Sequence, residues 1–274
     1  MRLFTVDRGK CKGDSICVAE CPLGVIEIKH SDTFPSVTEN GEDLCINCGH
    51  CVTVCPHGAF SLTTMKPEDC TLVMKEILPS ASQVEHFLKS RRSARAYKEE
   101  LVAREVLTKV IEIAAYSPSG HNDQPVHWTV IENSEELHRL RVLTIDWMRS
   151  IVEAMPDLEF TLTLERFVES WELGRDPVLR GAPHLIIAHA NTSVITSAVD
   201  CTIALSYLEL AAHSMGLAAC WAGAIQVAAG LYPPMTEALK LPSEHQSFGA
   251  MLIGYPKHRF PRIPLRNHPQ VSWR

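Results

Sequence analysis

Two cysteine-rich stretches constrain this chain more than any other feature. CKGDSICVAECP occupies residues 11–22 and CINCGHCVTVCP occupies residues 45–56, so each position of the second copy follows its counterpart by 34 residues. The first copy has Asp14 where the second has Cys48, and all other cysteines are shared. A short alternating run, VIEIK or AFSLT, follows each copy and is typical of a β-strand. The repeat predicts a small module of pseudo-two-fold symmetry over residues 1–65.

The cysteine spacing indicates iron–sulfur chemistry. Three thiolates at i, i+3 and i+6 let a tight loop wrap one cluster, and a fourth cysteine followed by proline ligates the other cluster. Zinc sites also use CxxC pairs and are the alternative. Seven of the ten cysteines lie within residues 11–55, which favours cofactor ligation over disulfides in a chain without a secretory signal. The others, Cys70, Cys201 and Cys220, are expected to be small buried apolar residues.

The net charge and the lack of long apolar segments limit the partners and the cellular compartment that this chain is expected to have. With 274 residues the chain can form two domains, and its net charge of -6 argues against a nucleic-acid-binding surface spread over the whole protein. The N-terminal MRLFTVDRGK lacks the apolar segment of a signal peptide, and no apolar run reaches the length of a membrane span. We therefore expect a cytoplasmic protein with neither a membrane nor a nucleic-acid partner.

The remainder of the chain predicts a larger α+β domain. Residues 66–80 have prolines near both ends and are expected to be a linker, with the second domain at 81–274. Apolar residues fall on one helical face in 101–117, and strands are predicted at 127–133, 184–190 and 247–256. A long apolar helix at 199–216 is expected to end at Gly216. Helices therefore alternate with strands around a predicted central mixed sheet, and the charged helical stretch 143–175 is expected to be an inserted lid.

Three polar motifs follow one another along this second part. RRSARAY at 91–97 places three arginines and a serine after a helix, and arginine suits bidentate phosphate recognition. Taken alone, such a motif is more commonly a basic helix end that faces solvent. SPSGHNDQP at 117–125 is a polar turn before a strand, and GYPKHRFPRIPLR at 254–266 is a basic loop after one.

Residues 1–65 resemble a bacterial two-cluster (two 4Fe-4S) ferredoxin. The resemblance implies that one cluster is ligated by Cys45, Cys48, Cys51 and Cys21, and the other by Cys11, Cys17 and Cys55 with Asp14 at its remaining corner. Asp14 could ligate the fourth iron of a 4Fe-4S cluster, could stand beside a 3Fe-4S cluster, or could be solvated with water at that corner. Oxygen suits this iron less well than thiolate, so a labile corner iron is expected.

The ordered set of motifs in residues 82–274 resembles the nitroreductase family, so the whole chain resembles a ferredoxin module fused to a nitroreductase domain. The resemblance implies a homodimer that binds FMN at its interface. It assigns the following residues to FMN: Arg91, Arg92, Ser93, Arg95 and Arg262 toward the phosphate and ribityl chain; Pro118, Ser119, Gly120, Asn122 and Gln124 in a turn from the partner subunit; and Cys220, Trp221, Ala222 and Gly223 in a loop beside flavin N5. No lysine aimed at flavin N1/O2 is found, and His121 is the one histidine considered as a proton donor.

These implications predict an FMN-dependent oxidoreductase. An external donor, a reduced ferredoxin, is expected to deliver single electrons through the two iron–sulfur clusters, and two-electron equivalents to leave for a small organic acceptor such as a nitroaromatic. One alternative is a flavoprotein fed by NAD(P)H that sends electrons outward through its clusters. Another is an electron-transfer or redox-sensing partner without a small substrate. Fold and cofactor do not choose the acceptor.

Overall fold

The computed structural model describes residues 3–30, 32–157 and 159–274 of the chain. These residues form two compact units. The first contains residues 1–78 together with 121–123, and the second contains 79–120 and 124–274. Each unit has its own apolar core.

The internal repeat of the sequence reappears in the backbone of the first unit. Helix α1 (Ile16–Ala19) and helix α3 (His50–Thr53) lie one repeat length apart in the chain. Each follows a residue in the left-handed region, Ser15 with φ 61° and Gly49 with φ 74°. Such a residue turns the chain sharply into a helix, so the two copies are confirmed as two equivalent loop–helix units.

Two small antiparallel ladders flank these helices. Strand β1 (Phe4–Val6) pairs with β4 (Phe60–Leu62), and β2 (Ile26–Glu27) pairs with β3 (Ser36–Val37). Helix α2 (Gly41–Leu44) follows β3, and two short 3₁₀ turns, η1 (Pro67–Asp69) and η2 (Lys75–Ile77), lead toward the second unit. The first unit therefore has two halves in which a strand follows each cysteine loop.

A four-stranded sheet organises the second unit, in the order β5 (His127–Ile131), β6 (His184–Asn191), β8 (His245–Gly254), β7 (Ala218–Trp221). All three pairings among the described residues are antiparallel, so the prediction of a mixed sheet is wrong. The helical crossover from β6 to β7 does leave these two strands pointing the same way. Strand β8 lies between them and pairs antiparallel with both. The prediction missed this arrangement because the position of β8 is set by non-local pairing, which leaves no trace in the sequence periodicity.

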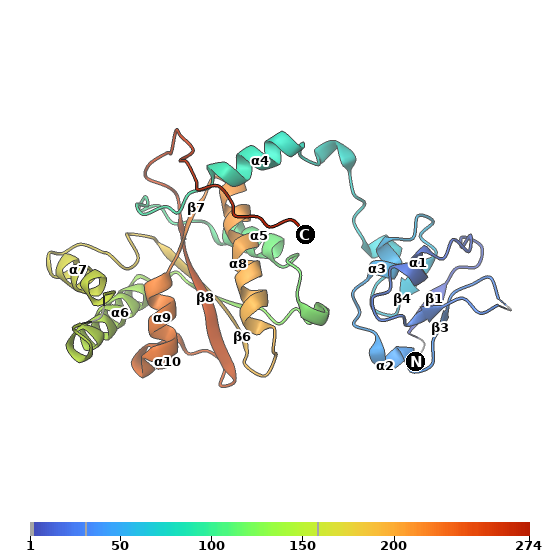
Figure 1. The fold of residues 1–274 in the computed structure, drawn as a ribbon, viewed down its shortest axis with the longest axis horizontal. Helices are drawn as coiled ribbons and strands as arrows, with labels where there is room; N and C mark the ends of the chain where they lie inside the picture. Colours follow the sequence, from blue (N-terminus) through green and yellow to red (C-terminus); the bar gives the residue numbers. More distant parts are fainter. Residues whose placement is uncertain (1–2, 31, 158) are drawn as a thin grey trace. The chain divides into compact units, whose positions relative to one another are not determined.

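Helices cover both faces of this sheet (Figure 1). One apolar cluster joins the sheet to α5 (Arg104–Ala114) and α8 (Ser197–Ser214). The other joins it to α6 (Ser134–Ala154), α9 (Gly223–Leu231) and α10 (Pro233–Leu239), with α7 (Thr161–Glu172) packed on α6. Helix α4 (Ala81–Ser90) begins the unit with a capping box between Ser80 and Gln83. The predicted α+β class is confirmed.

Two predicted boundaries in this unit can be compared with the structure. Gly216 has φ 75° directly after α8, and the Leu217 amide donates to the Ala212 carbonyl, which confirms the predicted helix end. Residue 143, the predicted start of the lid, lies inside the continuous helix α6. Leu140 and Ile145, on either side of that point, are both fully buried, so the first part of the stretch belongs to the core.

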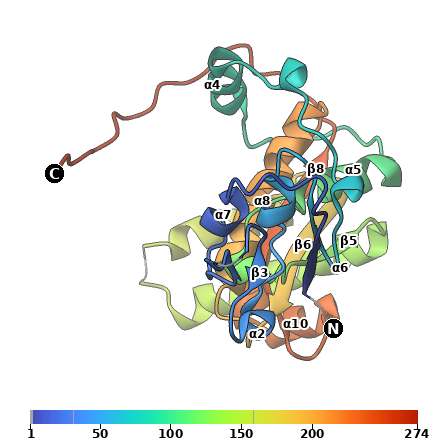
Figure 2. The same cartoon turned by 90° about the vertical axis from the view of Figure 1, so that its right-hand side faces the viewer.

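Residues 257–274 form no helix or strand and run as an irregular, exposed segment (Figure 2). Within the described part of the chain, no helix combines the length and apolar character needed to cross a membrane.

Candidate functional site

Two separate cavities in the first unit are lined by thiols. The first is lined by Cys21, Cys45, Cys48 and Cys51, together with apolar neighbours such as Phe4. The second is lined by Cys11, Cys17 and Cys55, together with Asp14 and His57. Thiolates in sets of three or four around an apolar cavity are the donor chemistry of an iron–sulfur cluster, so the residues present fit such a group.

Backbone amides point at one sulfur of each repeat. The Val25 amide donates to Cys21 Sγ, and the Ala59 amide donates to Cys55 Sγ, each over 3.4 Å. Hydrogen bonds to sulfur stabilise its anionic form and tune the potential of a cluster. Burial, followed by the neighbouring Cys48, raises the pKa of the Cys51 thiol to about 12. This thiol therefore stays protonated at neutral pH unless it is bound to a metal.

The Asp14 carboxylate has a partner outside the cavity. Its Oδ1 accepts from the Ile16 amide over 3.3 Å, at the start of α1. This local hydrogen bond forms a turn just before α1 and holds the carboxylate beside the cavity. His57 also lines this cavity and was not singled out from the sequence.

A basic cleft opens in the second unit. It encloses about 270 Å³ and is lined by Arg91, Arg92 and Ala94 of the RRSARAY motif and by the first residues of β7. His258 and Arg259, which follow β8, line the opposite side. Cationic side chains that converge on a concave surface attract a phosphate or a similar anion.

One arginine of the cleft has a carboxylate partner. Arg91 Nη1 lies 2.7 Å from Glu209 Oε1 on α8, and both side chains are mostly buried. The neighbouring Ser90 hydroxyl is 3.1 Å from His213 Nε2, one turn further along the same helix. Burial, together with the Arg91 charge, lowers the pKa of His213. Helix α8 thus fixes the RRSARAY segment through two polar contacts.

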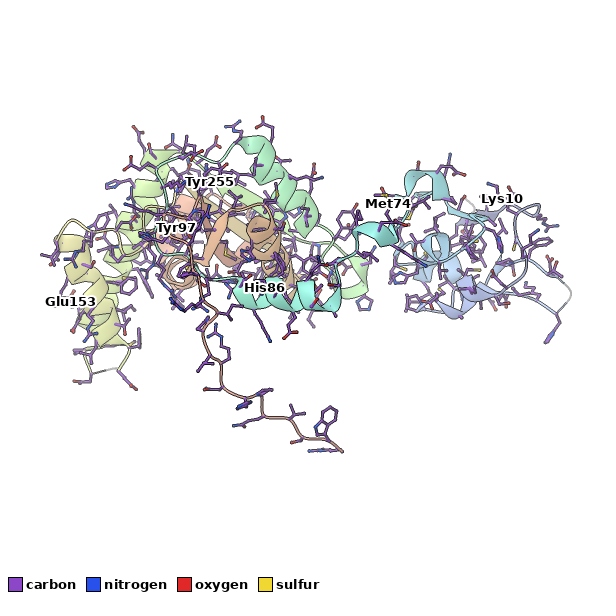
Figure 3. All side chains as sticks on the ribbon, turned by 90° about the horizontal axis from the view of Figure 1, so that it is seen from above. Lys10, Met74, His86, Tyr97, Glu153 and Tyr255 are labelled. Carbon is purple, nitrogen blue, oxygen red and sulfur yellow. The ribbon has the colours of Figure 1, made fainter. Side chains whose placement is uncertain are left out.

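The RRSARAY segment also runs along the sheet. The Ala94 amide donates to the Ala219 carbonyl on the edge strand β7, and the Lys98 amide donates to the Tyr255 carbonyl just after β8. Figure 3 shows Tyr97 and Tyr255 on these neighbouring segments. The Tyr97 hydroxyl donates to the Ala94 carbonyl over 3.1 Å and its ring is buried. Sequence positions 91–97 and 254–259 are therefore brought to one end of the sheet.

The polar turn at residues 117–124 has a strained backbone and is hydrogen-bonded to α8. His121, Asn122 and Gln124 all have positive φ, between 48° and 57°. The Gly120 amide donates to the buried Asp200 carboxylate on α8 over 3.1 Å, and a Cβ on Gly120 would lie 2.5 Å from Thr196. Backbone strain of this kind persists only where surrounding contacts enforce it, and it is concentrated at functional sites.

The members of this turn differ in their surroundings. The Ser119 hydroxyl accepts from the Gln124 amide over 3.0 Å, whereas Pro118 and the His121 side chain are exposed. Asn122 belongs to the first unit, where its side-chain amide donates to the carbonyls of Ile46 and Asn47. The turn residues predicted to bind FMN therefore do not line a common cavity within the described part of the chain.

The loop after β7 carries the remaining predicted residues. Cys220 is buried, Trp221 is 39% exposed, and Ala222 and Gly223 begin helix α9. The first amides of a helix have no partner within the helix and can face a ligand. The structure leaves open space where a Cβ on Gly223 would stand.

Sequence reasoning missed several residues of the cleft. Glu209 and His213 lie inside an apolar helix, and Arg259 takes the place on the cleft that was expected for Arg262, which is exposed and does not line it. Ser93 is half-buried and Arg95 exposed beside the lining residues. Arg259 follows the strand end by five residues and could have been found by its distance from Gly254 in the chain.

Comparison with known proteins identifies both units. The Nitroreductase family model matches residues 88–255, which is more than half of the chain, and a 4Fe-4S dicluster domain model matches residues 10–60. The chain belongs to the Nitroreductase family and carries an N-terminal 4Fe-4S dicluster domain. It is accordingly an oxidoreductase.

Individual relatives resemble the larger unit. The FMN reductase (NAD(P)H) of Bacillus subtilis strain 168 is 30% identical over 191 residues, which cover 67% of this chain and 72% of the relative. The iodotyrosine deiodinase of Thermotoga neapolitana is 26% identical over 186 residues, 68% of this chain and 94% of the relative. The crystal structure of a nitroreductase with bound FMN from Bacteroides fragilis NCTC 9343 has a TM-score of 0.59 at 23% identity and shares the fold over 70% of this chain and 99% of that protein.

Proposed function

We propose that the protein is an FMN-dependent oxidoreductase that receives single electrons through two iron–sulfur clusters and passes two-electron equivalents to a small organic acceptor. The observation that carries this proposal is that one chain contains two thiol-lined cavities and, in its nitroreductase unit, a cleft lined by arginines. When bound, the clusters would supply one-electron transfer and FMN would supply the coupling to two-electron chemistry.

The ligand sets we propose follow the division of residues between the cavities. Cys21, Cys45, Cys48 and Cys51 would hold one 4Fe-4S cluster. Cys11, Cys17 and Cys55 would hold the other, with Asp14 as the oxygen ligand of its fourth iron or beside a 3Fe-4S cluster. This proposal is supported by the lining of the two cavities and by the paired amide donors on Cys21 and Cys55.

The basic cleft is the part of the chain that we propose binds FMN phosphate. Arg91, Arg92 and Arg259 would bind the phosphate oxygens, and the pairing of Arg91 with Glu209 orients its guanidinium in advance. Ser93 and Arg95 follow in the same segment and would complete the set of residues that holds the phosphate and ribityl chain. Amides at the start of α9, near Gly223, would face the flavin ring.

A homodimer would complete the site, because the turn at 117–124 does not line the cleft of its own chain. The exposed apolar side chains Ile195, Val199 and Tyr207 at and near α8 support a second copy packing there, with exposed fractions of 97%, 60% and 39%. His121 of that turn, whose side chain is exposed, is our proposed proton donor to the acceptor.

Two electron donors suit this combination of units. A reduced ferredoxin would use the clusters as its entry point. The name of the Bacillus relative, an FMN reductase acting with NAD(P)H, favours NAD(P)H as a second candidate, with the clusters then passing electrons outward.

The test begins with protein purified without oxygen, from which flavin, iron and sulfide are quantified. Reduction of the bound flavin is then followed after mixing with reduced ferredoxin or with NADPH. We expect FMN, iron and sulfide together, and reduction by ferredoxin that is lost in Cys48→Ala but retained in the control Cys70→Ala. Zinc without sulfide would remove the electron relay, and equal ferredoxin-driven rates in the Cys48 variant and the control would contradict the proposed route.

A further inference from the structure

Three segments lie close together at one end of the sheet in the second unit: the turn before β6, the RRSARAY segment and the start of β7. The turn before β6 contains Arg180. Pro183 enters β6 opposite the end of β8, and a Cβ on Gly254 would lie 2.7 Å from Pro183 and 3.0 Å from the Tyr97 ring. Gly254 also pairs with Ala218, the first residue of β7. The turn before Pro183, the RRSARAY segment and the start of β7 are therefore neighbours, and Arg180 lies in that turn.

The backbone around Arg180 is held in a demanding conformation. Arg180 has φ 58° although it is not glycine, and Gly181 follows with φ 75°. The Asp176 carboxylate fixes this turn by accepting from the amides of Val178, Leu179 and Gly181 at 2.9–3.2 Å. Its second partner is Arg141 on α6, over 3.3 Å.

Two residues of the turn that contains Arg180 are buried in the core. Val178 and Leu179 are 5% and 1% exposed and belong to the core shared with Ala94 and Cys220. A positive φ at a non-glycine residue is unfavourable and is kept where surrounding contacts enforce it, often at a binding site. A partly buried carboxylate and two core residues therefore hold the backbone that carries the Arg180 side chain.

The charge of Arg180 has no counter-ion in the described part of the chain. Its guanidinium lies over the Phe167 ring, 5.8 Å from the centroid, and it forms no ion pair. Arg95, across the same end of the sheet, forms none either, whereas Arg91 is neutralised by Glu209. Ala94 and Leu179, the residues directly before Arg95 and Arg180, pack in one core cluster with Cys220 of β7. Burial raises the pKa of the Cys220 thiol, and the charges of Arg95 and Arg180 both oppose that rise. Two uncompensated cations close to one point repel each other unless an anion lies between them.

We propose that Arg180 and Arg95 together bind an oxyanion, in a subsite next to the Arg91–Arg92 cleft. The inference rests on the proposed FMN function and extends it by one binding residue. Guanidinium forks bind phosphate and carboxylate in the same bidentate way. The oxyanion is therefore either the FMN phosphate or a carboxylate on the acceptor, and the experiment distinguishes these two sources.

The test uses the full chain with its clusters intact and three variants. Arg180→Asn removes the charge and suits a left-handed backbone, which asparagine tolerates. Arg180→Lys keeps the charge and loses the fork. Arg175→Asn is the control, because Arg175 is an exposed arginine of the same connection. Tryptophan fluorescence confirms that each variant is folded.

Two readouts separate the sources of the oxyanion. The dissociation constants of FMN and riboflavin are measured on flavin-depleted protein, and KM is measured for 4-nitrobenzoate and for uncharged nitrobenzene. If the phosphate is bound, Arg180→Asn weakens FMN binding about tenfold or more and leaves riboflavin binding unchanged, with Arg180→Lys in between. If an acceptor carboxylate is bound, FMN affinity is unchanged and KM rises for 4-nitrobenzoate alone.

The inference is overturned if Arg180→Asn changes none of these four quantities relative to Arg175→Asn. A wild-type protein that binds FMN while the variant behaves like the control would leave the proposed function standing and remove only this inference. A wild-type protein that binds no FMN would remove both.

Discussion

Three histidines on adjacent strands lead to a prediction about acid stability. His189 on β6 is buried, its Nδ1 lies 2.9 Å from His245 Nδ1, and its Nε2 lies 3.1 Å from the Thr129 hydroxyl. The His127 ring stands 5.7 Å from it and 4.8 Å from the His245 ring. In the neutral state one proton lies between the two Nδ1 atoms. A second proton there would break that hydrogen bond and place a positive charge on a buried imidazole.

The size of the effect follows from the pKa of His189, which burial, then His245 and His127, lower to about 4. The unfolded chain protonates this side chain near its ordinary pKa of about 6.5, so between these values the unfolded state binds more protons. Stability is therefore complete above about pH 6.5 and falls as the pH drops toward 4. The loss is about 2 kcal/mol at pH 5 and about 3 kcal/mol in full, at 1.36 kcal/mol per pKa unit.

The experiment compares the wild type with His189→Asn, which cannot take up this proton. Denaturant unfolding at pH 7.5 and 5.0 is followed by tryptophan fluorescence, which reports on the second unit because all five tryptophans lie between residues 128 and 273. The variant loses hydrogen bonds at both pH values, but its stability relative to wild type should rise by about 2 kcal/mol on acidification. Burial also lowers the pKa values of His184 and His213, and their contributions cancel in this difference.

A matched control is His86→Asn on the exposed face of α4, which should leave the pH dependence of stability unchanged (Figure 3). If His189→Asn loses stability with falling pH as steeply as the wild type, then the histidine cluster is not the origin of the acid sensitivity.

Four further substitutions have predicted outcomes. Asp14→Cys supplies a fourth thiol to its cavity and should give about eight irons per chain, without an oxidised 3Fe-4S signal, by iron analysis and EPR. Gly249→Ala places a methyl group 2.2 Å from Leu205 Cδ1 and should lower unfolding free energy by about 1–3 kcal/mol, whereas Gly230→Ala, with open space around it in α9, should raise it by up to about 1 kcal/mol. Leu140→Ala opens a cavity at a fully buried site of α6 and should cost about 2–5 kcal/mol, measured by denaturant unfolding.

The first unit could be predicted from the sequence to an unusual degree because its determinants are local. Each cysteine loop carries its own ligating groups and its own turn, as the equivalent left-handed residues Ser15 and Gly49 illustrate. A second copy at a fixed distance then repeats the same backbone, including the amide donor to the last cysteine of each loop. The spacing of the cysteines is therefore enough to predict that the two loops have the same backbone conformation.

In the second unit, local features could be predicted from the sequence, but features that depend on distant residues could not. Helix ends such as Gly216 were predictable because they depend on a few neighbouring residues. The insertion of β8 between β6 and β7 depends on pairing between residues 54–69 positions apart in β6 and β8 and 30–36 positions apart in β7 and β8, which no local pattern encodes. The same holds for the cleft, where Glu209 comes from an apolar helix and Arg259 from an irregular segment, and the two are brought together only when the chain folds.

The two units also differ in how function and stability are connected. In the first unit, Cys17 and Cys51 are buried members of the apolar core, and Cys21, Cys45 and Cys55 pack against it. A unit of this size buries little apolar surface, so the side chains proposed to ligate iron are also a substantial part of what holds it together. In the second unit, the arginines of the cleft lie at the rim of a sheet whose two apolar clusters do not include them. Loss of ligands should therefore unfold the first unit, whereas the binding residues of the second can be changed one at a time on an intact scaffold.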